Sequence, residues 1–132
     1  MRPVYLNTIV VAAFAVLFAI AVSWLPFPIH RPNSARARYL KAQDSFRTLS
    51  EGFDIYRQKH GEFPEIHDFG SMVSADSPLA KGNFIPLGMS KTDEWGRPFI
   101  GTSSRKNYRL ECAGDPTNQT DYPHFTKEFI TP

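Results

Sequence analysis

The sequence predicts an α+β domain, in which one long helix packs on a small antiparallel sheet, with a membrane helix ahead of it. Three observations predict this architecture: an apolar run over residues 4–25, a helical spacing of apolar residues from 39 to 56, and a strand-like alternation over residues 107–112. The chain of 132 residues therefore divides into a transmembrane anchor or uncleaved signal at 1–25, a proline-rich linker at 26–33 and a domain at 34–132.

The apolar run is long enough to cross a bilayer. Its 22 residues would span roughly 33 Å as a helix, against a hydrocarbon core of about 30 Å. A buried core helix is a poor alternative, because the rest of the chain is too small to enclose a helix that is apolar all round. Small residues at Ala19 and Ala21 also fit a signal-peptide cleavage site, so a retained anchor, which we favour, and a cleaved signal both remain open.

The linker separates this segment from an amphipathic helix. Pro26, Pro28 and Pro32 cannot continue a helix, and Asn33 or Ser34 suits the N-cap of the next one. Apolar residues then recur every three or four positions, which places them on one helical face. They are Tyr39, Ala42, Phe46, Leu49, Phe53 and Tyr56. This stripe is shorter than four heptads, so packing on the protein's own sheet is expected rather than a coiled-coil partner.

A glycine and a proline mark the end of the helix. Gly61 follows Lys59 and His60, as expected of a C′ glycine behind a basic last turn. Phe63 then precedes Pro64 in an extended exit and is free to fold back on the core. Residues 71–86 predict an irregular connection with one short helical turn near 71–75.

The stretch "DEWGRPF" predicts a turn that enters a hairpin. Asp93 and Gly96 are favoured residues at the first and last positions of a type I turn. Pro98 pushes Arg97 to an extended conformation and suits the start or edge of a strand, which Phe99 continues.

Trp95 sits inside this predicted turn. We expect its ring to be buried against the helix stripe, where it would fix the docking angle of the sheet; stacking on a ligand is the alternative. After a polar turn region at 101–106, residues 107–112 predict a second strand. Tyr108, Leu110 and Cys112 would share one face of that strand, which makes Cys112 a buried hydrophobe rather than a nucleophile.

Charge and composition exclude several function classes. Residues 34–132 hold 13 basic and 13 acidic side chains, and the formal charge of +2 comes from Arg2 and Arg31. A neutral domain without a basic stripe is a poor candidate for nucleic-acid binding. A single cysteine forms no internal disulfide. We expect no enzyme, because no catalytic constellation appears and the spacing of the histidines and the cysteine matches no compact zinc pattern.

Three stretches together resemble the periplasmic domain of the major pseudopilin of the type II secretion system: "YRQKHGEFP", "DEWGRPF" and "NYRLECAGDP". The family's helix-end motif and tryptophan motif are matched by Tyr56, Gly61, Phe63, Pro64, Asp93, Trp95, Gly96 and Pro98, with Phe99 a looser match. Ala113, Gly114 and Asp115 loosely match its last loop. The resemblance implies a pilin-like fold, a single pass through a bacterial inner membrane with the domain in the periplasm, and partners among envelope or secretion proteins.

The sequence departs from this family near its start. The family's short leader, which ends in glycine before a Phe-Thr-Leu-Ile-Glu motif, has no match, and the first glutamate is Glu51. Three linker prolines also break the long helix that family members carry out of the membrane. We therefore expect a membrane-tethered relative that does not assemble into an ordinary pseudopilus. Whether it forms a filament stays open.

The resemblance also implies calcium in the last loop. Asp115, Asn118 and Asp121 offer side-chain oxygens there, and two carboxylates can begin a calcium site. Roles as plain turn residues are the alternative.

The charges after the apolar run argue for a different location. By the charge rule alone, the basic residues there would place the domain in the cytoplasm; they are Arg31, Arg36, Arg38 and Lys41. The resemblance implies the periplasm instead, and we follow the resemblance.

Two functions follow as expectations. The first is a membrane-anchored, pseudopilin-like structural or interaction protein of a type II secretion or pilus-like machinery. The second is a tethered, exported binding module for calcium or a cell-envelope ligand, unconnected with secretion.

Overall fold

A computed structural model describes residues 34–130. The predicted membrane segment at 1–25 and linker at 26–33 lie outside these residues, as do Thr131 and Pro132. Among the described residues, no helix combines the length and the apolar character needed to span a bilayer.

The first element is the long helix α2, Ala35–His60. The Ser34 hydroxyl accepts a hydrogen bond from the Ala37 N–H at 3.2 Å, which confirms the predicted N-cap. At the other end Gly61 has a left-handed backbone, with φ of 83°, and its N–H donates to the Arg57 carbonyl at 2.7 Å. Both predicted helix ends are confirmed, because each terminal residue satisfies backbone groups that the helix leaves unpaired.

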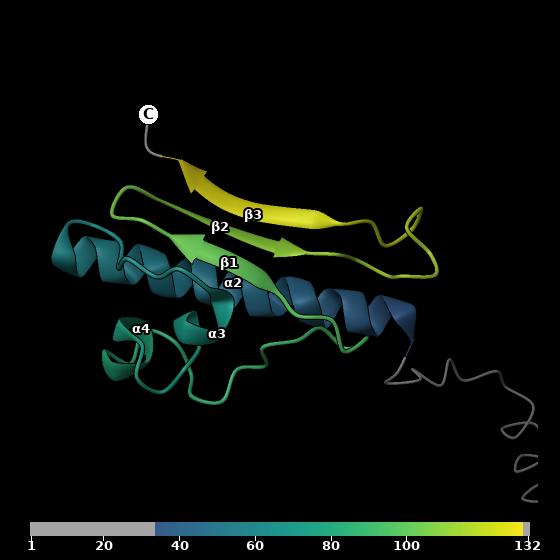
Figure 1. Cartoon of the computed structure of the whole chain (residues 1–132), viewed down its shortest axis with the longest axis horizontal. Coiled ribbons are helices and arrows are strands. Elements are labelled where there is room, and N and C mark those ends of the chain that lie inside the picture. Colours follow the sequence, from purple (N-terminus) through teal and green to yellow (C-terminus); the bar gives the residue numbers. More distant parts are fainter. Residues whose placement is uncertain (1–33, 131–132) are drawn as a thin grey trace, which may run out of the picture. The chain divides into compact units, whose positions relative to one another are not determined.

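Three antiparallel strands form one sheet in the order β1-β2-β3. They are β1, Ile100–Ser103, β2, Asn107–Cys112, and β3, Phe125–Ile130. Helix α2 runs along one face of this sheet (Figure 1). Tyr108, Leu110 and Cys112 of β2 are buried on that face, as the alternation predicts. The α+β class with one long helix on a small antiparallel sheet is confirmed.

The core lies between α2 and the sheet. From the predicted helix stripe, Ala42, Phe46, Leu49 and Phe53 are fully buried, and Tyr39 and Tyr56 at its two ends are partly buried. Phe53 stacks on Tyr108 with ring centroids 4.6 Å apart. The stripe therefore packs on the protein's own sheet, as expected. Phe63 folds back into the same core, also as expected.

The connection between α2 and the sheet is more ordered than predicted. It contains α3, Phe69–Met72, and α4, Pro78–Lys81, where one short helical turn near 71–75 was expected. Each begins at a capping side chain, Asp68 and Ser77, that accepts a backbone N–H. Both helices lie on the side of the sheet where β1 is (Figure 1), and they add Met72 and Leu79 to the core.

The sheet differs from the prediction in the extent of β1 and in the presence of β3. Residues 101–103 belong to β1 rather than to a polar turn, because Gly101 and Ser103 face the core and pair with Leu110 and Tyr108. Strand β3 was not predicted at all. Its sequence does alternate, with Phe125 and Phe129 packed against the core and threonine, glutamate and isoleucine on the outer face. That period-two pattern was the signal available in the sequence.

Candidate functional site: two loops at the start of the long helix

The "DEWGRPF" motif forms a tight hairpin turn. The Gly96 N–H donates to the Asp93 carbonyl at 3.0 Å, as predicted for a type I turn, and the Asp93 N–H donates to the Arg97 carbonyl at 2.8 Å. Gly96 has a φ of 80°, the left-handed conformation that closes a three-residue hairpin loop. Thr92 and Pro98 form an isolated antiparallel bridge at its base, so Pro98 occupies the strand-entry position predicted for it.

Asp93 holds this turn together from inside. Its side chain is only 1% exposed, and Oδ1 accepts the backbone N–H groups of Trp95 at 3.0 Å and Arg97 at 2.8 Å. An aspartate that binds backbone groups two and four residues ahead fixes the turn without help from solvent. Sequence reasoning assigned Asp93 to the turn but did not anticipate its burial.

Arg97 supplies the opposite charge, a role that sequence reasoning missed. Its Nε lies 3.5 Å from Oδ2 of Asp93, and its side chain is 33% exposed. The Nε and Nη2 atoms are buried and make no hydrogen bond within residues 34–130. The Asp93 carboxylate is therefore the group that balances a partly desolvated guanidinium.

The effect of these charges reaches the middle strand β2 and the loop that follows it. Burial raises the pKa of the Cys112 thiol; the negative charge of Asp93 raises it further, while Arg97 lowers it. Two hydrogen bonds from Thr117 lower the pKa of Asp115, and the charge of Arg97 adds to this lowering. A buried thiol with a raised pKa is the reverse of an activated nucleophile, and the expected burial of Cys112 is confirmed.

The position of Trp95 differs from the prediction. Its side chain is partly exposed, and it is not among the residues that pack on the core within the described chain. Phe99, four residues later, occupies the position in the core that was expected for Trp95. Its ring centroid lies 5.1 Å from that of Phe46. The expected burial of Trp95 on the helix stripe is therefore wrong. In a three-residue hairpin loop the tip residues point away from the base, where the strand residues enter the core.

This partial exposure gives a stability prediction. We expect Trp95→Ala to lower the free energy of unfolding by about 1–3 kcal/mol, because a ring that is partly exposed and lies outside the core loses less burial than a core aromatic. Phe99→Ala is the matched comparison and should cost about 3–5 kcal/mol, the range for a buried large aromatic. Denaturant melts of both variants measure the difference. A loss for Trp95→Ala as large as that for Phe99→Ala would contradict the assignment.

An ion pair fastens the turn to the helix. Nζ of Lys41 in α2 lies 2.6 Å from Oε1 of Glu94. Both side chains are at least one third exposed, so the pair adds little stability, but it shows which part of α2 the turn lies against. The turn thus sits beside the second turn of α2.

The loop between β2 and β3 lies at the same end of the helix (Figure 1). The ring of Tyr39 in α2 lies 5.4 Å from that of Tyr122 in this loop and 5.2 Å from that of Phe125 at the start of β3. The loop is closed by a hydrogen bond from the Asp115 N–H to the Tyr122 carbonyl at 2.9 Å. The two motif loops therefore meet around the first turns of α2.

The two predicted calcium ligands lie in this closed loop. Oδ1 of the buried Asp115 accepts the Thr117 N–H at 2.8 Å and its hydroxyl at 2.7 Å. The exposed Asp121 accepts the Asn118 amide at 2.9 Å. These are bonds of turn residues, and among the described residues no three metal-binding side chains come together. Calcium binding therefore stays a prediction.

The helix-end motif lies at the opposite end of α2. Gly61 caps the helix, and the buried Pro64 follows Phe63 next to the end of β1, where its carbonyl accepts the Ser103 hydroxyl. Tyr56 is partly buried, with its ring 5.4 Å from that of Phe84. These residues therefore have structural positions, and they do not join the two loops at the start of α2.

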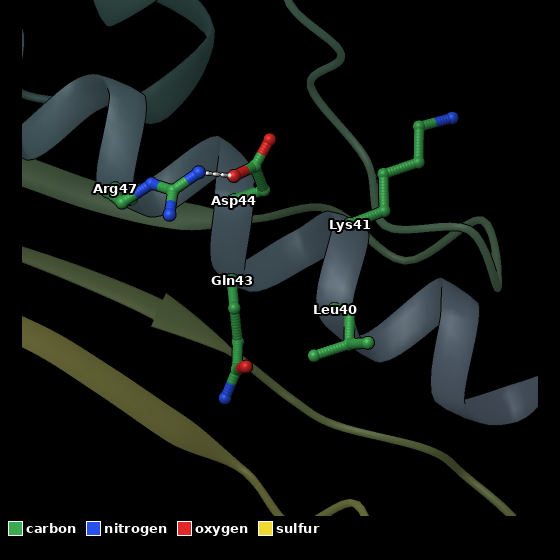
Figure 2. A pocket seen from close by; sticks show the side chains of 5 residues that line it. All are labelled: Leu40, Lys41, Gln43, Asp44 and Arg47. Carbon is green, nitrogen blue, oxygen red and sulfur yellow. Dashed lines mark hydrogen bonds and ion pairs between the residues drawn. The ribbon is translucent and has the colours of Figure 1, made fainter.

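An open concavity lies on the exposed side of α2 (Figure 2). It is lined by Leu40, Lys41, Gln43, Asp44 and Arg47. Asp44 and Arg47 already pair with each other, and Lys41 pairs with Glu94. With its charges paired and Leu40 as its one aliphatic side chain, the concavity offers no convergent set of groups for chemistry on a substrate.

No protein family, curated protein or solved structure matches this chain.

Proposed function

We propose that the protein is a membrane-anchored, pseudopilin-like structural or interaction protein of a secretion or pilus-like machinery in a bacterial envelope. In this role residues 1–25 hold it in the inner membrane as a single pass, and the domain presents its surface to envelope partners in the periplasm. Residues 1–25 meet the length and hydropathy expected of such an anchor.

The observation that carries the proposal is the structural use of the motif residues. Gly61 ends α2, Phe63 packs into the core, and the buried Asp93 closes a turn whose tip is left partly exposed. These residues determine the shape of the domain and expose part of one turn. They follow one another along the chain in the order that the resemblance implies. A rigid turn with a partly exposed aromatic residue at its tip suits binding to another protein, because little conformational entropy is lost on contact.

Deletion of the gene in its own bacterium tests this function. We expect the culture supernatant to lose exported proteins, and the full chain to restore them, while a chain without residues 1–25 does not. Restoration by the untethered domain would contradict an anchored role. Normal export in the deletion strain would remove the secretion role and leave the second function, a tethered binding module.

Topology gives an independent prediction. A fusion of alkaline phosphatase after Pro132 is expected to be active in a bacterial host, because this enzyme matures only outside the cytoplasm, where its disulfides form. The positive charges after residue 25 predict the reverse. An inactive fusion, with full-length protein present in the membrane, would place the domain in the cytoplasm and contradict the proposed location.

For the second function we propose calcium as the ligand, held by Asp115 and Asp121 in the loop between β2 and β3. Two carboxylates give modest affinity, near the weak extracellular range of roughly 10⁻⁴–10⁻³ M. At about 2 mM calcium such a site would stabilise the protein by only ~0.6–1.8 kcal/mol. We expect a small rise in melting temperature with calcium, none with magnesium, and none in Asp115→Asn.

Asp54→Asn is the matched control for this test, because Asp54 is an exposed aspartate on α2 outside the loop. Its calcium-dependent rise should equal that of the parent protein. Equal melting temperatures of the parent protein in calcium and in chelator would leave the loop as a plain turn.

A further inference from the structure

The first turn of α2 carries two arginines, Arg36 and Arg38, and no acidic residue. Arg36 is exposed and Arg38 is partly exposed. Neither forms an ion pair with any other side chain in the part of the chain that the structure describes. The next basic residue, Lys41, is already paired with Glu94.

These arginines oppose the dipole of their own helix. The N-terminus of a helix carries partial positive charge, so cations there are unfavourable and carboxylates are preferred. The other end of α2 follows the favourable rule, with Arg57, Lys59 and His60 in its last turn. The folding of the domain therefore gives no reason for Arg36 and Arg38, and a binding partner of negative charge would give one.

The chain keeps this turn close to a membrane surface. If residues 1–25 span the bilayer, as in the proposed function on which this inference rests, only the eight residues 26–33 separate them from Ser34. Eight residues reach roughly 29 Å when fully extended. The linker would therefore limit the first turn of α2 to within about 29 Å of the membrane, which raises its effective concentration at the phospholipid headgroups.

We propose that the first turn of α2 docks on anionic phospholipid headgroups of the membrane that holds residues 1–25. Arg36 and Arg38 make the charge contacts, and a basic residue near an anionic surface contributes about fivefold to binding. The turn of Trp95 lies beside Lys41 in the second turn of α2, and partly exposed tryptophan favours the headgroup region. The two motif loops are thereby presented at the membrane surface.

Trp95 can report this docking. Trp24→Phe leaves Trp95 as the single tryptophan of the full chain. This variant is reconstituted into vesicles that contain a lipid with a nitroxide quencher on its headgroup. The quenching of Trp95 fluorescence is then measured in vesicles of phosphatidylcholine alone and in vesicles with added phosphatidylglycerol. We expect stronger quenching with phosphatidylglycerol, and loss of the difference at high salt, because salt screens exposed charges.

Substitution of both arginines separates docking from mere proximity. Arg36→Gln with Arg38→Gln should lower the ratio of docked to undocked domain about 30-fold in phosphatidylglycerol vesicles. Arg105→Gln is the matched control, because Arg105 is equally charged but lies by Phe63, at the far end of α2. It should leave quenching unchanged. The double variant should also melt slightly higher in detergent, which shows that it folds.

The outcomes of these experiments distinguish a failure of the docking from a failure of the proposed membrane anchor. Protein that alkaline carbonate washes off the vesicles would show that residues 1–25 do not insert, and the proposed anchor would fail. Stably inserted protein whose Trp95 quenching is equal in the two lipid mixtures would overturn the docking alone. An equal loss of Trp95 quenching in the Arg105→Gln control and in the double variant would also overturn the docking.

Discussion

Asp93→Ala is expected to lower the free energy of unfolding by about 2–4 kcal/mol, because a buried carboxylate that accepts two backbone N–H groups and faces a partly buried guanidinium is lost. The substitution leaves the Trp95 and Arg97 N–H groups without their acceptor and leaves two buried nitrogens of Arg97 without a balancing charge. Denaturant-induced unfolding of the parent and variant proteins measures this loss.

Two further variants show whether burial of the charge is the cause. Glu94→Gln removes the neighbouring carboxylate, which has a partly exposed pair with Lys41, and should cost no more than about 1 kcal/mol. Arg97→Ala combined with Asp93→Ala should cost clearly less than the sum of the two single losses, because the double variant has no unbalanced buried charge. Additive losses would show that Asp93 acts through its backbone hydrogen bonds alone.

Gly114→Ala is expected to cost about 2–5 kcal/mol. Gly114 has a φ of 76°, which disfavours any residue with a Cβ. A Cβ at this position would also lie 2.5 Å from the Tyr122 carbonyl oxygen and 2.5 Å from the Pro123 carbonyl carbon. Both contacts are to backbone, so relief requires the loop between β2 and β3 to move, and the hydrogen bond from Asp115 to Tyr122 would be strained.

Gly96→Ala is the matched control for backbone strain. Gly96 has nearly the same φ, 80°, but a Cβ there would meet nothing within 4 Å. This variant should cost only the conformational term, about 1–2 kcal/mol. Thermal or denaturant melts compare the two. Similar losses of unfolding free energy in both variants would mean that the loop between β2 and β3 can move at little cost. Its close packing against residue 114 would then not be what stabilises it.

Together these results would define the start of α2 as a rigid end of the domain. One loop is fixed by a buried charge pair and the other by close backbone packing, and both contact the first turns of the helix. Rigidity at this end matters for the proposed function, because a partner or a membrane surface would meet a shape that is already formed.

The sequence by itself determined the long helix and its two ends. Its stripe is strictly periodic, and Ser34 and Gly61 act on backbone groups only a few residues away. The turn at Asp93 was equally readable, because a type I turn depends on residues within four positions. Local hydrogen bonds of this kind can be predicted from neighbouring residues alone, because they do not depend on the rest of the chain. The alternation of β2 was also visible, since one of its faces is buried.

The tertiary structure decided what these elements bury. The sequence places Asp93 in a turn but does not show that its carboxylate is buried, and in the folded chain its side chain is 1% exposed while that of Arg97 is 33% exposed. Likewise Phe99, and not the larger Trp95, enters the core. Burial depends on residues far apart in the chain that the fold brings together, and no local pattern encodes which of two aromatic side chains will meet them.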